Sequence, residues 1–283
     1  MHMKCAWQLF LNLLPVWMRE QVDRHGKETL QELRLRLNSP PELVRNNGII
    51  RMQRDVSYDD LQYCINIASS YSPWAASTTT YGYITASGGH RIGICGDTVV
   101  SGSVVKGIRK ITSLCIRVAR DFHGIAEKTQ ALSGSVLIIG SPGSGKTTLL
   151  RDMIRIHSNI GQAISVIDER QELFPLVPSG FAFDTGIRTD ILTGCPKAAG
   201  IDIALRSMCP DIIAVDEITE QSDCEALMRA GWCGVRLFAT AHAGSRDELF
   251  SRPVYKPIVQ SDLFDSLIIL HRDKHWNLER MRK

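Results

Sequence analysis

The chain has 283 residues, of which 44% are hydrophobic and 22% are charged, and its formal net charge is +3. These values exclude a largely disordered chain, argue against a dedicated nucleic-acid binder, and leave room for one large core or two modest ones. The eight cysteines form no C-x-x-C pair, which argues against a zinc site or a disulfide framework and favours reduced core residues in a cytoplasmic protein.

The first residues, 1–14, form an apolar segment that ends at Pro15 and is too short to cross a bilayer. It also lacks a cleavage-site pattern. We therefore expect no transmembrane segment, so that any contact with a membrane comes through partners or the protein surface. The other end, His271 to Lys283, is locally basic, and a solvated surface is its simplest interpretation.

The first half of the chain has the pattern of an α+β domain. Leucines alternate with charged residues between Glu32 and Leu37, which predicts a strand with one buried face. Two short apolar runs flank Asn46-Asn47-Gly48, whose Asn-Gly pair favours a tight hairpin turn. Ser57, followed three residues later by Asp60, predicts the start of a helix. Further strands are expected over residues 81–86, 90–95 and 111–119.

From residue 134 onward, strand-like and helix-like segments alternate. We therefore divide the chain into an α+β N-terminal domain (residues 1–120), a helical linker (121–133) and an α/β domain (134–283) with a mainly parallel sheet. The expected strands of that sheet are the apolar runs 136–139, 163–167, 212–215 and 235–239. Ligands of such sheets bind beyond the carboxyl ends of the strands, so the residues after each run are the candidates for chemistry.

A phosphate-binding loop follows the first of these strands. Residues 140–147 fit the pattern G-x-x-x-x-G-K-[ST], between a buried strand and a segment with helical spacing. Backbone N–H groups of such a loop and the end of the following helix form a cradle for phosphate oxygens. Lys146 is expected to reach the β and γ phosphates of ATP, and the Thr147 hydroxyl to hold Mg²⁺. The residues expected to line the nucleotide are Gly140, Ser141, Pro142, Gly143, Ser144, Gly145, Lys146, Thr147 and Thr148.

Two carboxylates follow the third apolar run. Asp216 is expected to anchor Mg²⁺ through water, opposite Thr147, and Glu217 to accept a proton from the water that attacks the γ phosphate. This pair predicts an ATPase rather than a kinase for a small acceptor. A buried strand that merely ends in Asp-Glu is the alternative, and the phosphate loop about 70 residues earlier disfavours it.

The other strand ends give weaker signals. Asp168 and Glu169 are either an ordinary helix cap or groups near Mg²⁺ and its water, with Glu169 the stronger candidate. Thr240 and His242 are either satisfied polar residues beside a turn or residues that respond to the γ phosphate. In the second interpretation, Thr240 senses the γ phosphate from a strand between the loop and Asp216, and His242 reports it to a neighbouring subunit. Arg206 is either a catalytic arginine or a partner in an ion pair on a helix surface.

Several longer strings resemble the stage III sporulation protein AA family over about residues 8–270. They are Glu32–Arg36, Gly82–Ile94, Val166–Arg170, Gly186–Leu192, Cys195–Ala198, Leu205–Asp211 and Ala239–His242. The family is similar to the motor ATPases of type II and type IV secretion systems, which work as rings, usually hexamers, on the cytoplasmic side of a membrane. The resemblance departs at Thr219, where glycine is expected.

This resemblance implies a RecA-like P-loop ATPase core with ATP and Mg²⁺ as cofactors, and it supports roles for Glu169 and His242. It also implies a ring-forming motor that works in the mother cell with membrane-embedded proteins of the stage III sporulation complex. Such a motor would energise a transenvelope complex during endospore formation. In a ring, an arginine of one subunit can stabilise the transferring phosphoryl group of its neighbour. The sequence does not identify this arginine, and the eligible residues are Arg34, Arg36, Arg91, Arg109, Arg117, Arg170, Arg188 and Arg206. Of these, Arg91 and Arg206 are preferred.

Two alternatives share the same core. A nucleic-acid-dependent ATPase of the RecA type is disfavoured by the small net charge and by the lack of a basic, aromatic-rich stripe. A nucleotide-gated scaffold would bind ATP to assemble partners with little hydrolysis. Because a scaffold has little activity to lose, turnover of a Glu217→Gln variant separates it from a motor.

Overall fold

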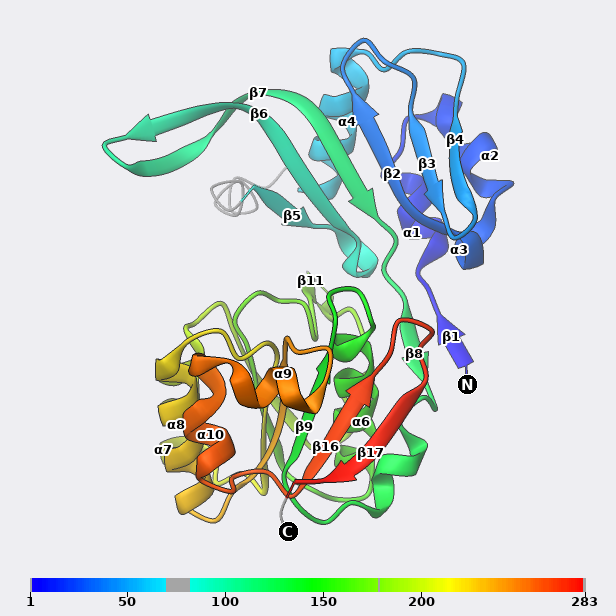
Figure 1. The fold of residues 1–283 in the computed structure, drawn as a ribbon. Coiled ribbons are helices and arrows are strands. Elements are labelled where there is room, and N and C mark those ends of the chain that lie inside the picture. Colours follow the sequence, from blue (N-terminus) through cyan, green and yellow to red (C-terminus); the bar gives the residue numbers. More distant parts are fainter. Residues whose placement is uncertain (1, 70–81, 178, 282–283) are drawn as a thin grey trace. The chain divides into compact units, whose positions relative to one another are not determined.

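A computed structural model describes residues 2–69, 82–177 and 179–281 of the chain (Figure 1). The chain forms two compact units. The N-terminal unit consists of Met3–Asp121 together with Pro175–Phe183, and the C-terminal unit of Met1–His2, Phe122–Phe174 and Asp184–Lys283. The short segment Pro175–Phe183 thus belongs to the N-terminal unit although its neighbours on both sides in the sequence belong to the other. Two of the four dividing positions lie within β1 (His2–Lys4) and β8 (Asp121–His123).

The N-terminal unit is built on a six-stranded antiparallel sheet in the order β4-β3-β2-β7-β6-β5. Its strands are β2 (Leu30–Arg36), β3 (Glu42–Arg45), β4 (Gly48–Arg51), β5 (Tyr83–Thr85), β6 (Arg91–Ser101) and β7 (Val104–Arg117). The alternation that predicted β2 is confirmed, because Leu33 and Leu35 are buried while Arg34 and Arg36 are exposed. The hairpin turn is also confirmed, since Asn46 and Asn47 join β3 to β4.

Helices complete the core of this unit. They are α1 (Trp7–Asn12), α2 (Val16–Asp23), α3 (Gly26–Thr29) and α4 (Tyr58–Ala68), with the 3-10 turn η2 (Ser87–Gly89) and the short strands β11 (Leu176–Val177) and β12 (Gly180–Phe181). The predicted start of α4 is confirmed, because the Ser57 hydroxyl accepts from the N–H of Asp60 and the Asp60 carboxylate accepts from the N–H of Ser57. Tyr81, the first residue of one predicted strand, lies outside the described residues.

Strands β6 and β7 are longer than the sequence predicts. Past Cys95 they continue as a two-stranded ribbon beyond the other strands of the sheet (Figure 1). Val99, Val100 and Val105 are exposed on this ribbon. Most residues of this ribbon are exposed, so the periodicity that finds half-buried strands does not reveal it.

The C-terminal unit is built on a seven-stranded sheet in the order β13-β10-β14-β15-β9-β16-β17, in which only the last pairing is antiparallel. Its strands are β9 (Val136–Gly140), β10 (Ile164–Asp168), β13 (Thr189–Thr193), β14 (Ile212–Val215), β15 (Arg236–Ala241), β16 (Ser266–Leu270) and β17 (Trp276–Arg280). Strands β9, β10, β14 and β15 confirm the four predicted runs. The sequence reasoning missed β13, β16 and β17, of which β13 and β17 are edge strands with few buried residues.

Helices cover both faces of this sheet, as expected for an α/β protein. They are α6 (Lys146–Asn159), α7 (Lys197–Ser207), α8 (Gln221–Trp232), α9 (Arg246–Ser251) and α10 (Lys256–Gln260), with the 3-10 turns η3 (Glu127–Ala131) and η4 (Pro253–Tyr255). On one face, Ile201 of α7 and Leu227 of α8 share a core with Leu237 of β15. On the other face, His157 of α6 makes an edge contact with Phe238, the next residue of β15 (4.9 Å between ring centroids).

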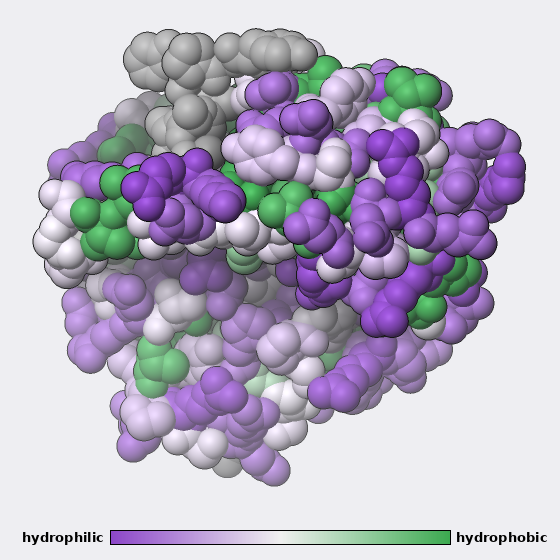
Figure 2. All heavy atoms as spheres, turned by 90° about the horizontal axis from the view of Figure 1, so that it is seen from above, coloured by the Kyte–Doolittle hydropathy of each residue, from purple (hydrophilic) through white to green (hydrophobic). Residues whose placement is uncertain are grey.

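On the face seen in Figure 2, hydrophilic side chains predominate, and hydrophobic ones gather in small separate groups. Within the described residues, no helix combines the length and the apolar composition that a membrane span requires. All eight cysteines are free thiols. The expectation of core cysteines holds for Cys64 and Cys224 but is wrong for Cys95, Cys209 and Cys233, which are exposed.

Candidate functional site

The phosphate loop connects the end of β9 to the start of α6 and has the backbone shape that the motif predicts. A Cβ atom at Gly140 would come within 2.6 Å of the carbonyl oxygen of Leu270, so that only glycine fits beside β16. Gly145 has a φ of +106° and precedes the first residue of α6. The N-terminal end of a 14-residue helix therefore faces the loop, and its positive end favours an anion there.

Lys146 points back into this loop. Its ammonium donates to the carbonyl oxygens of Gly140 (2.9 Å) and Ser141 (3.2 Å) and to Nδ1 of His242 (3.0 Å). None of these partners carries a negative charge, and the side chain is buried. Burial lowers the pKa of Lys146, because the ammonium has lost most of its water.

The Asp216 carboxylate accepts hydrogen bonds from two hydroxyl groups on neighbouring elements. Thr147 donates to its Oδ2 (2.7 Å) and Thr240 to its Oδ1 (2.6 Å). The strand order places β15 between β9 and β14, which confirms that Thr240 comes from a strand between the loop and Asp216. Burial raises the pKa of Asp216 in spite of these hydrogen bonds. Within the described residues, neither the half-buried Asp216 nor the buried Lys146 forms an ion pair.

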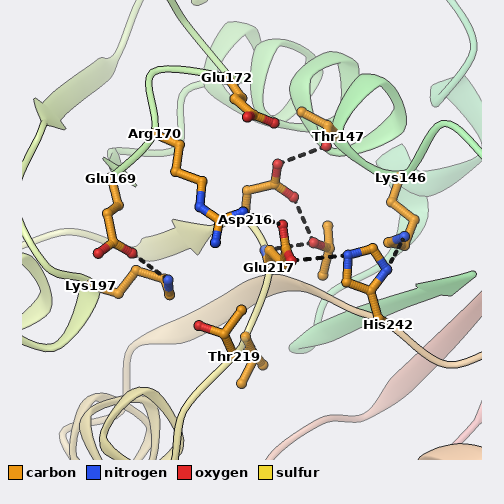
Figure 3. A network of polar contacts seen from close by, with 12 residues as sticks. Lys146, Thr147, Glu169, Arg170, Glu172, Lys197, Asp216, Glu217, Thr219 and His242 are labelled. Atoms are coloured by element: carbon orange, nitrogen blue, oxygen red, sulfur yellow. Dashed lines mark hydrogen bonds and ion pairs between the residues drawn. The ribbon is translucent and has the colours of Figure 1, made fainter. Parts of the chain in front are cut away.

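Glu217 follows β14 in a left-handed backbone conformation, with a φ of +56°. Its N–H donates to the Thr240 hydroxyl (2.8 Å), and its two carboxylate oxygens contact His242 Nε2 (3.1 Å) and Arg170 (3.1 Å). His242 therefore bridges Lys146 and Glu217 within one chain (Figure 3). Because its Nδ1 accepts from an ammonium, the neutral imidazole carries its proton on Nε2 and donates to Glu217.

A small pocket opens beside Asp216 and Glu217 and contains more acidic than basic groups. Asp168, Glu169, Arg170, Glu172, Lys197, Asp216 and Glu217 line it. Glu169 forms an ion pair with Lys197, the first residue of α7 (Figure 3). The carboxylate of Asp168 accepts from the N–H groups of Glu172 (2.9 Å) and Phe174 (2.8 Å), so it fixes the loop after β10. In the described chain no helix lies between β10 and β11 (Leu176–Val177), so Asp168 is not a helix cap, and its carboxylate instead holds the loop that leads to β11.

Arg206 does not line this pocket. It is exposed in the last turn of α7, nine residues after Lys197 and therefore about 14 Å further along the helix axis. Within the described part of the chain it makes no hydrogen bond or ion pair, so the alternative of a surface ion pair is not realised either. A role of Arg206 across a subunit boundary stays a prediction.

The fold also brings to the site three residues that the sequence did not single out: Glu172, Lys197 and Lys274. Arg170, which the sequence offered only as one of several arginines that could act on a neighbouring subunit, contacts Glu217 of its own chain. Glu172 follows a predicted strand, so its position near the end of that strand could have indicated it. Lys197 follows Pro196 at the start of a helix behind an unpredicted strand. Lys274 lies in the basic tail that was interpreted as solvated surface, yet its ammonium contacts the phosphate loop. Arg282 and Lys283 of that tail lie outside the described residues.

The residues present fit a nucleotide with Mg²⁺. The described residues contain no group of three or more His, Cys, Asp or Glu side chains that could hold a metal ion. Mg²⁺ in nucleotide sites is held by one or two protein groups, with phosphate oxygens and water as the other ligands, and Thr147 and Asp216 suffice for that. In the loop, the buried hydroxyl of Ser144 has no hydrogen-bond partner, which leaves a donor for a phosphate oxygen.

The fold and the strand-end residues together define the class: a RecA-like P-loop fold shared with secretion ATPases. The ATPase DotB from Legionella pneumophila superposes with a TM-score of 0.59 at 17% identity, covering 94% of this chain and 80% of that chain. The pilus retraction motor PilT, solved with bound ADP, also has a TM-score of 0.59 at 17% identity, with 88% and 76% covered. At such identity the likeness concerns the fold.

The chain belongs to the family described as sporulation stage III, protein AA, whose model matches residues 8–278. Stage III sporulation protein AA of Bacillus subtilis (strain 168) is 35% identical over 256 residues, which cover 87% of this chain and 83% of that protein. The uncharacterized protein ycf45 of Porphyra purpurea is 25% identical over 257 residues, which cover 88% of this chain and 43% of that protein. The resemblance noted in the sequence is thereby confirmed.

Proposed function

We propose that this protein is a Mg²⁺-dependent ATPase that acts as a motor, energising the assembly of, or transport through, a transenvelope complex during endospore formation. The observation that carries the enzymatic part is the hydrogen bond of 2.7 Å between the Thr147 hydroxyl and Asp216. It joins the phosphate loop to the acid at the end of β14, the two places from which Mg²⁺ of a nucleotide is held. Membership of the sporulation family supports the biological part.

In the proposed reaction, the Lys146 ammonium leaves the loop carbonyls and turns to the β and γ phosphates. The phosphates then give the ammonium the negatively charged partners that it does not contact among the described residues. Mg²⁺, when bound, neutralises the charge that develops on the phosphate oxygens. His242, released by Lys146, no longer ties Glu217 to the loop, and the Glu217 carboxylate can accept a proton from water. Thr240 orients both Asp216 and the backbone of Glu217. Glu169 and Lys197 set the charge of the neighbouring pocket.

The test is steady-state ATP turnover and ATP binding of the native protein beside Glu217→Gln. Removing the general base should lower turnover roughly 10²- to 10⁴-fold and leave ATP affinity within a small factor. Glu225→Gln is a matched control, because it makes the same change on the exposed surface of α8, where Glu225 accepts from Gln221 (3.0 Å). Turnover of Glu217→Gln equal to that of the native protein would remove Glu217 from the mechanism.

One observation favours the scaffold as a second candidate. Both carboxylate oxygens of Glu217 are engaged, by His242 and by Arg170, so the base is masked in this conformation. A protein that keeps these contacts with nucleotide bound would bind ATP and hydrolyse it barely. Native protein that binds ATP with Mg²⁺ but shows no turnover, alone or with its membrane partners, would favour this function over the motor.

The motor proposal includes a ring of identical subunits, expected to be a hexamer, at the cytoplasmic face of a membrane in the mother cell. Its partners are membrane-embedded proteins of the stage III sporulation complex, and binding of nucleic acid is not part of it. Solution mass with and without ATP and Mg²⁺ tests the ring, and an assembly of several subunits is expected with both present. In such a ring, Arg206→Ala should reduce turnover without weakening ATP binding if it acts on a neighbour's site.

A further inference from the structure

We propose that Lys274 is a positioning residue of the nucleotide site, which holds the phosphate loop in its binding shape from outside the motif. Its ammonium donates to the carbonyl oxygens of Gly143 (2.7 Å) and Ser144 (3.1 Å). The inference rests on the proposed function, because it assigns to Lys274 a share in binding nucleotide phosphates. Lys274 lies 128 positions after Lys146 in the sequence, and only the fold brings the two to one loop.

The turn that carries Lys274 is fixed to the same edge of the sheet as the phosphate loop. Strand β16 runs parallel to β9, and Leu270 at its end is paired with Gly140 at the end of β9. The N–H of His271 donates to the carbonyl of His275 (2.9 Å), which closes the turn between β16 and β17. The N–H of Lys274 donates to the carbonyl of His271 (3.1 Å). Lys274 is therefore presented by a hydrogen-bonded turn, not by a loose tail.

The backbone of Lys274 is in the left-handed region, with a φ of +73°. A residue with a Cβ atom is strained there, and glycine is the residue that best fits such a position. Glu217, with a φ of +56°, is the proposed general base and shares this feature. Strained residues gather at functional sites, where the side chain has a use that outweighs the backbone cost. For Lys274, that use is the pair of hydrogen bonds to the loop.

The two hydrogen bonds act on the orientation of the loop peptides. In a trans peptide the C=O and the following N–H point in opposite directions, and the described chain contains no cis peptide bond. With the Ser144 carbonyl held by Lys274, the N–H of Gly145 points away from Lys274. A phosphate cradle needs loop N–H groups turned inward in this way. Lys274 thus favours the binding conformation before any phosphate arrives.

Lys146 and Lys274 hold different halves of the loop. Lys146 holds the carbonyls of Gly140 and Ser141, and it must release them to reach the phosphates. Lys274 holds the other half and has no such second task. Because loop N–H groups contact the α and β phosphates, which ADP and ATP share, loss of Lys274 should weaken both nucleotides by the same factor.

The experiment compares the affinities of ADP and ATP, with Mg²⁺, and the melting temperature among Lys274→Ala, Lys274→Gly and Lys274→Arg. The first two should bind both nucleotides about tenfold more weakly, and the arginine, which keeps N–H donors, should stay within about threefold of the native protein. Lys274→Gly should also melt at a higher temperature than Lys274→Ala, because glycine relieves the left-handed strain. Arg272→Ala, on the same turn, is the control and should bind as the native protein does.

Lys146→Ala separates this inference from the proposed function. If it loses nucleotide affinity while Lys274→Ala and Lys274→Gly bind normally, the inference is overturned and the function stands. If Lys146→Ala itself binds normally, both are overturned. If Lys274→Gly lowers both the melting temperature and the nucleotide affinity, and Lys274→Arg restores neither, the turn has only a structural role and the inference is overturned. The inference is supported if Lys274→Ala and Lys274→Gly lose ADP and ATP affinity by the same factor and Lys274→Arg retains it.

Discussion

The buried His90 of the N-terminal unit and the site residues Lys146 and Asp216 of the C-terminal unit have different kinds of hydrogen-bond partner. In the N-terminal unit, the buried His90 has both ring nitrogens satisfied, by the carbonyl of Ala6 (3.0 Å) and the N–H of Ala119 (3.1 Å). In the C-terminal unit, Lys146 has only neutral partners and Asp216 has only hydroxyls. A buried group that is complete within its own chain supports the fold, and one that lacks a counter-charge is arranged for a ligand.

The same contrast holds for ion pairs. In the N-terminal unit, Glu42 contacts Arg36 and Arg51 on the sheet, and Glu32 likewise contacts two arginines. These pairs bring opposite charges together at the surface. In the C-terminal unit, the pairs beside the proposed nucleotide site include Arg170 with Glu217 and Lys197 with Glu169, and we expect these pairs to rearrange when phosphates bind. The following predictions test this distinction, from the largest expected effect to the smallest.

Asp216→Asn should lower ATP turnover on the order of a thousandfold, because the ligand that holds Mg²⁺ is lost. The same change should raise the melting temperature of the nucleotide-free protein at neutral pH. Because the pKa of Asp216 is raised in the folded state, its charge costs stability as pH rises through that pKa, and asparagine removes the cost. Asp202→Asn, at the exposed pair with Arg229, is the control and should change neither quantity. A destabilised Asp216→Asn would contradict the contrast between the units.

For His90, burial lowers the pKa to about 4, from an ordinary value of 6.5. The unfolded chain therefore binds a proton more readily, and stability should fall as pH falls from about 6.5 toward 4, by up to about 3 kcal/mol. Free energies of unfolding measured over this pH range should show a clearly smaller change for His90→Gln than for the native protein. Parallel curves for the two proteins would exclude His90 as the cause.

His242→Asn should lower turnover about tenfold and leave ADP affinity unchanged, because the imidazole links Lys146 to Glu217 and has no contact with the loop carbonyls. Measurement of kcat with ATP, beside the dissociation constant of ADP, checks this. Equal weakening of ADP and ATP binding would instead show that His242 only supports the loop. His242 would then have a structural role, like the buried His90 of the N-terminal unit.

Ser57→Ala should destabilise the protein by about 1 kcal/mol without an effect on turnover, because it removes the N-cap of α4 in the N-terminal unit. Ser69→Ala, at the other end of the same helix, is a matched control with a near-zero expected change. Denaturant unfolding and ATP turnover are the measurements. An effect of Ser57→Ala on turnover at constant stability would break the assignment of this helix to a structural role.

Much of the site could be predicted because its signals are local in the sequence. The loop from Gly140 to Thr147 is recognised from consecutive residues, and Asp216-Glu217 ends an apolar run that is typical of a buried strand. The roles of neighbours were harder to infer. His242 was expected to report to another subunit, and in the fold it joins Lys146 to Glu217 of the same chain. Such a link depends on which strand lies beside which, and periodicity does not give strand order.

The sequence by itself determined the class of fold and the position of the phosphate loop in the sheet, because glycine conformations, apolar runs and helix starts are set by residues near one another in the chain. Only the tertiary structure decided that Arg170 and His242 share the carboxylate of Glu217, that Lys274 holds the loop, and that Pro175–Phe183 belongs to the N-terminal unit. These contacts join residues far apart in the chain, and their geometry follows from the packing of strands and turns as a whole.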